Sequence, residues 1–428
     1  MLKENSKTER ISPIIFLFLF SITLISRLYL FGYPSEVVFD EFHFGKFVNA
    51  YLKNESFFDI HPPLGKLIIA GFTRIFAPSL PCSFQEIGQE CPPLTFYLLR
   101  TPVVIAGILL IPIFYLFLKE LTSSKITGFI GAFFLIIENA FVVQSRFGLL
   151  DIFLIFFGFL GLYLFLRFNQ KRNFFFLFFS GLSLGASFSI KWTGAGFFAI
   201  FLFLLIFKNK DRWKEKLKYL ILISLPFLFV YLFSFWIHFK LIPNQSEKKV
   251  FYEQALFVGE DFENLNFFQK IFRINKIMFS SQETLKDVPH PYQSDPFFWP
   301  LMEKPIFYWL KDKKQIFLIG NPLLWYSSSF SFLLLIMAFI LKEIKKFFQY
   351  SYFLIFFFLF SFLINYLPFF FIQRSLFLYH YLTPYSFLIA NLAFLIEKIR
   401  EENQFLALTF LAIFFLSFFK NFAITYGL

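Results

Sequence analysis

Residues 94–118 read LTFYLLRTPVVIAGILLIPIFYLFL, an apolar run that contains a single charged side chain, Arg100. A helix needs about 20 mostly apolar residues to cross the hydrocarbon core of a bilayer. This run is long enough to do so, and it therefore predicts a membrane-spanning helix.

The same pattern recurs along the whole chain. Of its residues, 57% are hydrophobic and 16% are charged, and the mean hydropathy is +0.64. A soluble domain has about 25% charged residues. We therefore expect an all-α polytopic membrane protein with about eleven transmembrane helices. The expected spans are residues 12–31, 94–118, 125–144, 147–167, 174–191, 193–207, 217–238, 322–341, 351–371, 375–396 and 403–424.

The basic residues predict which side of the membrane each connection occupies. Lys and Arg are enriched in short cytoplasmic connections. One side collects most of them, beginning with the N-terminal segment 1–10, so we expect a cytoplasmic N-terminus. The short connections on the opposite side contain only Arg146, Lys191 and Arg374. The net charge of +12 is thus a topology signal, and no nucleic-acid partner is expected.

Two long connections lie on the expected outer side, at residues 32–93 and 239–321. Long loops in a compact protein are usually functional. No internal repeat or low-complexity linker is visible, so we treat residues 1–428 as one membrane domain with two large extracytoplasmic loops. Cys82 and Cys91 both fall in the first loop. They can form a disulfide in an oxidising compartment, or they can be two buried free thiols.

An acidic pair, Asp40 and Glu41, follows the first span within the apolar stretch PSEVVFDEFHFGKF (34–47). Carboxylates in such a setting are costly unless they are paired or used. Adjacent helical residues point about 100° apart, so only one of the two is expected in a given site. This favours one general base with a supporting neighbour. No cluster of His, Cys and carboxylates has metal-ligand spacing, and we predict no bound metal.

A second stretch in the same loop reads FFDIHPPLGKL (57–67). Its two prolines predict an extended entry into a helix that begins near Leu64. His61 and Lys66 lie near that helix start, where cations and a helix N-terminus can hold a phosphate. The alternative is an interfacial amphipathic helix whose Lys66 extends to the membrane surface.

Together with several later motifs, these two stretches resemble the protein O-mannosyltransferase family of the GT-C glycosyltransferase superfamily. The later motifs occur in the family's order over nearly the whole chain. Residues 239–321 are too few for the β-trefoil MIR domain of eukaryotic members, so the chain resembles the compact bacterial form. The later motifs are QSRFGLLD (144–151), KWTG (191–194), HPYQSDP (290–296), GNP (320–322) and RSLFLYHYL (374–382).

The resemblance implies an inverting enzyme that transfers mannose from a polyprenyl-phosphate carrier to Ser or Thr hydroxyls of proteins, including proteins in translocation. The reaction would occur on the extracytoplasmic face of the bacterial inner membrane. No cofactor is required beyond the lipid-linked donor. A phosphate leaving group needs positive charge rather than a strong acid, and a hydroxyl acceptor needs one base. The sequence does not indicate the oligomeric state.

From the Asp-Glu motif we assign Asp40 as the general base and Glu41 as its supporting neighbour. Each further candidate has a structural alternative, because a cation can cap a helix or snorkel, Arg100 can form a buried salt bridge, and Asp151 can cap its helix. From position and charge we expect Arg146, Lys191, Arg374, His380, Lys66 and His61 at the donor phosphate, and His43, His290, Tyr292, Arg100 and Asp151 as residues that shape the site.

Three other functions stay open on sequence grounds. Related enzymes with the same fold transfer sugars to lipid A or to glycans, and they also place an acidic pair in the first loop. A transporter or flippase would use intramembrane charges as a substrate path, but the broken spans in two related halves that it requires are not visible. A structural membrane protein would leave the motifs without chemistry.

Overall fold

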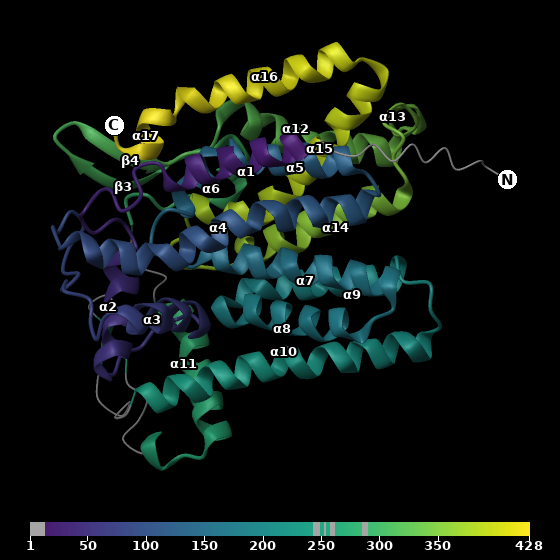
Figure 1. Ribbon diagram of the computed structural model, residues 1–428. Coiled ribbons are helices and arrows are strands. Elements are labelled where there is room, and N and C mark those ends of the chain that lie inside the picture. Colours follow the sequence, from purple (N-terminus) through teal and green to yellow (C-terminus); the bar gives the residue numbers. More distant parts are fainter. Residues whose placement is uncertain (1–12, 243–248, 252–253, 257–261, 285–289) are drawn as a thin grey trace.

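The computed structural model describes residues 13–242, 249–251, 254–256, 262–284 and 290–428, and long helices that lie side by side dominate it (Figure 1). Among these residues, six helical segments are long and apolar enough to span a bilayer, and five shorter apolar helices accompany them. The expected all-α membrane fold is confirmed, whereas the number of crossings stays a prediction. The basic residues Lys3, Lys7 and Arg10 of the topology argument lie outside the described residues.

Apart from the two long loops that follow α1 and α10, the helices of the bundle follow one another through shorter connections. α7 packs against α4 and α8, α8 packs against α10, and α15 packs against α5, α12, α14 and α16. Most of α15 is buried and little of α10 is, so α15 lies in the centre of the bundle and α10 at its edge. The bundle helices are α1 (Pro13–Leu28), α4 (Pro93–Thr122), α5 (Lys125–Ile136), α7 (Asp151–Lys171), α8 (Phe174–Ile190), α9 (Ala195–Phe207), α10 (Trp213–Leu241), α12 (Pro322–Ile340), α14 (Tyr352–Tyr366), α15 (Leu382–Glu402) and α16 (Gln404–Lys420).

One of the expected spans is divided into two helices, and two others begin a few residues later than expected. The span at 125–144 is divided into α5 and the short α6 (Asn139–Gln144). Arg27 causes this break, since its guanidinium donates to the carbonyls of Leu135 and Ile136 at 2.7 and 2.9 Å. α7 begins only at Asp151, and α15 is preceded by the 3₁₀ helix η5 (Leu378–Tyr381) rather than starting near residue 375.

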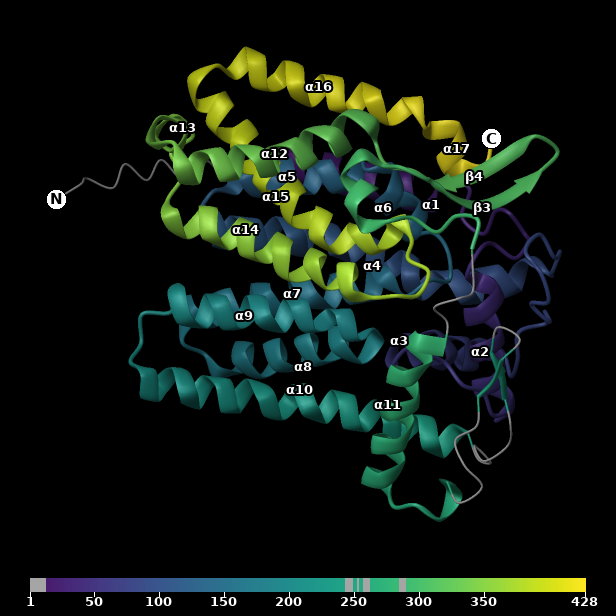
Figure 2. The same ribbon diagram turned by 180° about the vertical axis from the view of Figure 1, so that it is seen from behind.

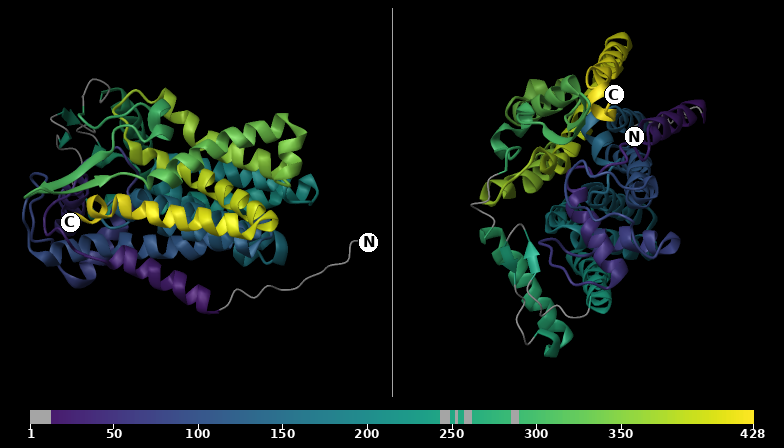
Figure 3. Two further views of the ribbon diagram at one scale, coloured as in Figure 1. Left: turned by 90° about the horizontal axis from the view of Figure 1, so that it is seen from above. Right: turned by 90° about the vertical axis from the view of Figure 1, so that its left-hand side faces the viewer.

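The two outer loops fold into additional elements at one end of the bundle (Figures 1 and 3). The first loop forms α2 (Glu41–Lys53) and α3 (Leu64–Phe76), which starts at the predicted residue. The second loop adds two antiparallel hairpins that the all-α expectation did not include. Its elements are β1 (Lys249–Phe251), β2 (Gln254–Leu256), η2 (Phe262–Asn264), α11 (Phe267–Thr284), η3 (Pro296–Leu301), β3 (Ile306–Lys311) and β4 (Lys314–Leu318).

Short elements complete the two ends of the molecule. α17 (Phe422–Tyr426) packs against β4 and α6 near the C-terminus, and α13 (Lys342–Phe347) lies at the opposite end (Figure 2). Two more 3₁₀ helices, η1 (Trp192–Gly194) and η4 (Leu367–Phe371), precede α9 and follow α14. In the first loop, Cys82 and Cys91 form a disulfide with their Cα atoms 5.5 Å apart.

Candidate active site

The acidic pair lies at the start of α2, and Glu41, its second member, connects the first loop to the bundle. Glu41 is fully buried, and each of its oxygens accepts two N–H groups. Arg100 donates from Nε and Nη2 at 2.8 Å each, Gly148 donates at 2.8 Å, and Val38 donates at 3.2 Å. Arg100 also donates to three backbone carbonyls of residues 32–36. The Glu41–Arg100 pair thus ties the first loop to α4 and to the turn before α7.

Asp40, the first member of the pair, has different surroundings. Its side chain is half-buried, and its carboxylate makes no hydrogen bond or ion pair with another residue that the structure describes. Burial raises the pKa of Asp40 to about 7, while the positive charge of Lys191 opposes this rise and the negative charge of Asp151 adds to it. A carboxylate with open oxygens and a pKa near neutrality is suited to take a proton from a hydroxyl group.

The residue before Asp40 has a strained backbone. The φ angle of Phe39 is 41°, in the left-handed region that bulky residues rarely adopt. Tyr308 of β3 holds it there: the two rings stack with centroids 4.6 Å apart, and the Phe39 N–H donates to the Tyr308 carbonyl at 3.1 Å. Strain of this kind clusters at functional sites. The contact fixes the direction in which the first loop presents Asp40, and sequence patterns single out neither Phe39 nor Tyr308.

Asp151 and Lys191 form an ion pair close enough to Asp40 to influence its pKa. Lys191 Nζ lies 2.8 Å from Asp151 Oδ1, and Gln144 donates to Oδ2 at 2.9 Å. Gln144 in turn accepts the Tyr308 hydroxyl at 2.5 Å. The Lys191 ammonium group also lies 5.0 Å from the ring centroid of Tyr379. The structure therefore brings together residues from three separate motifs, and the charges of Lys191 and Asp151 both act on Asp40.

The surroundings of Lys66 match neither the expected phosphate site nor the expected extension to the membrane surface. It is only 1% exposed, and it forms an ion pair with Asp59. Its ammonium group also donates to the carbonyls of His61 and Pro62 at 3.0 and 3.1 Å. These three acceptors match the three protons of an ammonium group. Lys66 therefore organises the turn before α3, and neither phosphate binding nor extension to the membrane surface fits this arrangement.

Several positively charged side chains lie near His61. Its pKa lies well below the ordinary value because of burial first and then because of the nearby positive charges of Lys191, Arg374 and Lys66. Its ring is consequently neutral at physiological pH. Arg374 is half-buried in the non-helical segment between η4 and η5, and its charge also acts on Asp40. Cations at these positions can attract an anionic ligand.

His380 lies deeper in this cluster. Its ring is buried and stacks on those of Tyr379 and Trp299, with centroid separations of 4.3 and 6.1 Å. Its Nδ1 atom lies 3.1 Å from the backbone nitrogen of Phe377. His380 thus holds the segment that positions Arg374 and Tyr379.

His43, His290 and Tyr292 lie at the border of the cluster. Burial, Lys46 and His290 lower the pKa of His43 to about 3, so His43 and His290 are electrostatic neighbours. His290 Nδ1 accepts the Tyr292 N–H at 3.2 Å, and its ring lies 4.8 Å from that of Phe377. These contacts join the second outer loop to the late segment of the chain.

Arg146 is not placed with the other candidate phosphate ligands. Its terminal nitrogens donate to the carbonyls of Thr425, at 3.0 Å, and of Tyr29 and Leu30, at 3.1 Å each. The guanidinium also lies 4.6 Å from the ring centroid of Tyr426. Arg146 therefore joins α17 to the chain that follows α1, and we remove it from the proposed phosphate ligands.

The GNP motif has a structural role that explains its position. The Asn321 N–H donates to the buried carboxylate of Glu138 at 2.9 Å, and the Asn321 side chain donates to the carbonyls of Ile137 and Phe414. Tyr385 donates to the other oxygen of Glu138 at 2.9 Å. This network fills the break between α5 and α6. Sequence analysis did not single out Glu138.

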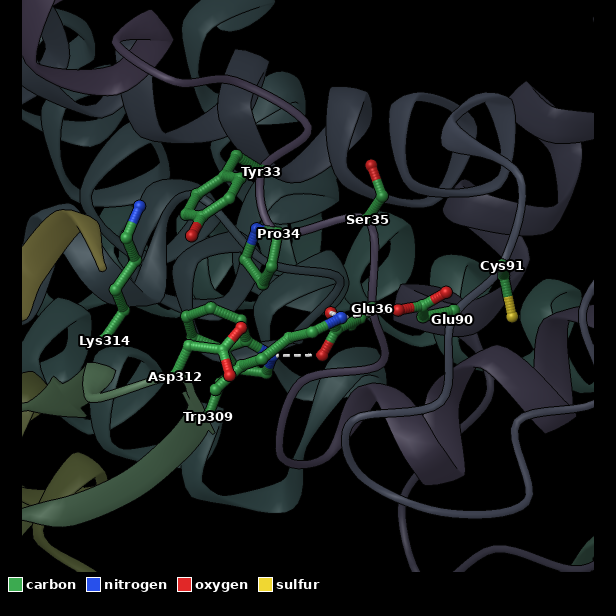
Figure 4. A pocket seen from close by; sticks show the side chains of 10 residues that line it. Tyr33, Pro34, Ser35, Glu36, Glu90, Cys91, Trp309, Asp312 and Lys314 are labelled. Atoms are coloured by element: carbon green, nitrogen blue, oxygen red, sulfur yellow. Dashed lines mark hydrogen bonds and ion pairs between the residues drawn. The ribbon is translucent and has the colours of Figure 1, made fainter. Parts of the chain in front are cut away.

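A separate cavity of about 400 Å³ lies between the first loop and the hairpin β3–β4. Figure 4 shows the side chains that line it. Glu36 accepts the indole N–H of Trp309 and lies 2.7 Å from Lys311 Nζ, which also binds Glu90. Trp309 and Lys311 of β3 line this cavity, whereas the ring of Tyr308 stacks on Phe39 next to Asp40. The cavity is therefore a feature of the first loop and β3 that is distinct from the candidate active site.

Two family models match the chain. The model for dolichyl-phosphate-mannose-protein mannosyltransferase matches residues 17–243, and the model for the C-terminal four TMM region of protein-O-mannosyltransferase matches residues 267–428. The first match alone includes more than half of the chain, together with the acidic pair and Lys191. The second includes Arg374 and His380.

Individual relatives agree with this assignment. The chain is 31% identical over 242 residues to protein O-mannosyltransferase 1 of Drosophila melanogaster (52% of this chain, 27% of the relative). It is 32% identical over 289 residues to dolichyl-phosphate-mannose–protein mannosyltransferase 4 of Saccharomyces cerevisiae (62% and 34%). The matched region thus spans about a third or less of the length of these relatives.

Solved structures share the fold. The S. cerevisiae protein O-mannosyltransferase Pmt1-Pmt2 complex bound to the sugar donor matches with a TM-score of 0.82 at 19% identity, over 97% of this chain and 90% of that chain. The Archaeoglobus fulgidus oligosaccharyltransferase in the apo form matches with a TM-score of 0.54 at 15% identity, over 96% of this chain and 55% of that chain. The fold is therefore of the GT-C type.

Proposed function

Because the chain belongs to the dolichyl-phosphate-mannose–protein mannosyltransferase family, we propose that it transfers mannose from a polyprenyl-phosphate-mannose donor to Ser or Thr hydroxyls of secreted or membrane proteins. The observation that supports this most strongly is the position of Asp40. It is a carboxylate without a partner among the described residues, beside one that Arg100 holds, and the positive charges of Lys191 and Arg374 act on it.

In the proposed reaction, Asp40 accepts the proton of the acceptor hydroxyl while the hydroxyl oxygen attacks the anomeric carbon of mannose. A new C–O bond forms, the bond from the anomeric carbon to the phosphate oxygen breaks, and the polyprenyl phosphate leaves with the electron pair. One base and direct displacement invert the anomeric configuration. The leaving phosphate is a stable anion, so the step needs stabilising charge rather than a strong acid.

We assign the donor phosphate to Lys191 and Arg374, with the neutral His61 as a hydrogen-bonding neighbour. His380 acts through the segment that it holds, and Glu41 with Arg100 positions Asp40. No metal or cofactor enters this reaction. Among the residues that the structure describes, no group of three His, Cys, Asp or Glu side chains is placed to hold a metal ion.

The proposed location is the inner membrane of a bacterium, with the N-terminus in the cytoplasm and the active site on the outer side. The distribution of Lys and Arg over the short connections supports this orientation. The elements that form the site, α2, α3 and the hairpin β3–β4, gather at the end of the bundle that carries the two long loops (Figure 1). The outer face is also where acceptor proteins emerge during translocation.

A transfer assay tests the proposal. Purified protein in lipid receives radiolabelled polyprenyl-phosphate mannose and a Ser/Thr-rich acceptor peptide, and the expected result is label on the peptide. Label on a lipid or glycan instead would contradict the protein acceptor and favour the alternative of the same fold. Movement of the donor across the bilayer without transfer would favour a flippase.

Replacement of Lys191 by Gln is expected to lower kcat/KM for transfer by about a hundredfold, because one cation that stabilises the leaving phosphate is removed. Initial rates at varied donor concentration measure the loss. Lys218→Gln is the matched control, since Lys218 is an exposed lysine at the other end of the bundle in α10. Equal rates for the two variants would remove Lys191 from the donor site.

The activity is expected to rise with pH through a midpoint of about 7, because only the ionised form of Asp40 accepts a proton and its pKa is raised to about 7. Below this midpoint the rate falls about tenfold per pH unit. The donor phosphodiester stays anionic over this range, so it does not produce the same profile. Measurement of kcat/KM from about pH 5.5 to about pH 8.5 checks the result. A flat profile would contradict the assignment of Asp40 as the base.

A further inference from the structure

Helix α11 of the second outer loop has an apolar face that the rest of the described chain does not cover. Phe268, Phe272 and Phe279 are 69%, 73% and 68% exposed. Their spacing of four and seven residues places them on one side of the helix. A contiguous apolar surface of this kind marks a site of interaction with a protein or a membrane.

The opposite face of α11 is seated on the protein. Ile274 and Met278 are buried, and they line a small hollow together with Phe235 of α10. Asn275 accepts the hydroxyl of Tyr231 from α10 at 2.5 Å. α11 is therefore held in a fixed position, and its exposed phenylalanine face is not the result of an undocked helix.

The position of α11 indicates what its apolar face meets. Figures 1 and 2 show α11 running across the direction of α10, at the end of the bundle that carries α2 and α3. α10 is a candidate span at the edge of the bundle, and its Phe229 and Trp236 are 57% and 47% exposed. An exposed side chain of a spanning helix faces lipid. A helix that crosses such a span at its outer end lies in the plane of the membrane surface.

The charges of α11 fit the same position. Lys270, Arg273 and Lys276 follow one another at intervals of three residues, and at 100° per residue they occupy the flank between the phenylalanine face and the buried face. The sole acidic residue of the helix, Glu283, lies in its last turn. Helices with an apolar face and a basic flank lie in the headgroup region of a bilayer and bind anionic lipids.

We propose that α11 is an anionic-phospholipid-binding helix of the outer leaflet. Its phenylalanine face enters the boundary between headgroups and acyl chains, and its basic flank contacts lipid phosphates. The Tyr231 hydroxyl that binds Asn275 also accepts the indole N–H of Trp192, next to Lys191. These two hydrogen bonds connect α11 through α10 to η1, which follows Lys191 directly. This inference does not depend on the proposed function.

Site-directed fluorescence quenching tests the membrane position. The two natural cysteines are paired, so Phe272→Cys introduces a single reactive thiol for a fluorophore. Asp312→Cys, in the turn between β3 and β4, is the exposed control. In nanodiscs with acyl-chain spin-labelled lipid, we expect at least about twofold more quenching at position 272 than at position 312. Equal quenching would overturn the proposal and leave a protein partner to cover the face.

The second arm tests the lipid charge. With spin-labelled phosphatidylglycerol the quenching at position 272 is expected to exceed that with spin-labelled phosphatidylcholine by about threefold. The triple change Lys270→Gln, Arg273→Gln and Lys276→Gln is expected to abolish this preference. The change Lys304→Gln, Lys313→Gln and Lys314→Gln, with the same loss of net charge, retains it. Equal quenching by the two lipids in the unaltered helix would overturn the assignment of anionic lipid.

Discussion

Replacement of Asp40 by Asn is expected to reduce kcat for mannose transfer by at least about a thousandfold, which is the contribution of a well-placed general base. Asn has nearly the same shape and cannot accept the proton. The carboxylate of Asp40 has no partner among the described residues, so its loss leaves no ion pair broken. The folded state should therefore be unaffected, and the thermal midpoint of the purified variant should match that of the natural protein.

Asp312→Asn is the matched control for this variant, because Asp312 is an exposed carboxylate in the turn between β3 and β4. It should transfer mannose at the natural rate. Donor binding, measured separately, should also persist in Asp40→Asn, and it should become slightly tighter because one negative charge near the phosphate is removed. A variant that keeps more than about a tenth of the natural kcat would show that another group takes the proton.

Asp40, the proposed base, could be singled out from sequence because its signal is local. An acidic pair placed directly after an apolar span is visible without any tertiary information, and so is the helix that starts at Leu64. The apolar runs also predict most of the bundle, since a spanning helix needs its own length of apolar residues. The helix break at residues 137–138 could not be predicted, because its cause is Arg27, more than a hundred residues away in the chain.

Contacts that exist only in the folded protein also explain why Arg146 and Lys66 do not have the surroundings expected from sequence. The scarcity of basic residues in outer connections singled out Arg146, Lys191 and Arg374, but it contains no information on what each cation contacts. Arg146 binds carbonyls near the two ends of the chain. Lys66 binds its own turn, because the two prolines that start α3 leave carbonyls directed at its ammonium group. Tyr308 was missed because no motif includes β3, whose contact with Phe39 exists only in the folded protein.

Replacement of Arg100 by Leu is expected to lower the free energy of unfolding by about 3 to 5 kcal/mol, because the change leaves the buried carboxylate of Glu41 without its counter-charge. Three carbonyls of residues 32–36 lose their donor in the same step. Thermal unfolding in detergent and in nanodiscs measures the loss. Arg100→Lys should be nearly as damaging, since a single ammonium group cannot reproduce the bidentate contact with Glu41 and reach those carbonyls as well.

The double variant Glu41→Gln with Arg100→Leu separates stability from catalysis. Removing both charges should recover part of the lost stability, because a buried charge without a partner costs more than the absence of the pair. Activity should not recover, because the two contacts with Arg100 that tie the start of α2 to α4 are lost, and Asp40 is presented from that start. If the double variant regained both properties, Asp40 would be positioned by the stacking of Phe39 on Tyr308 alone, and the buried ion pair would serve stability only.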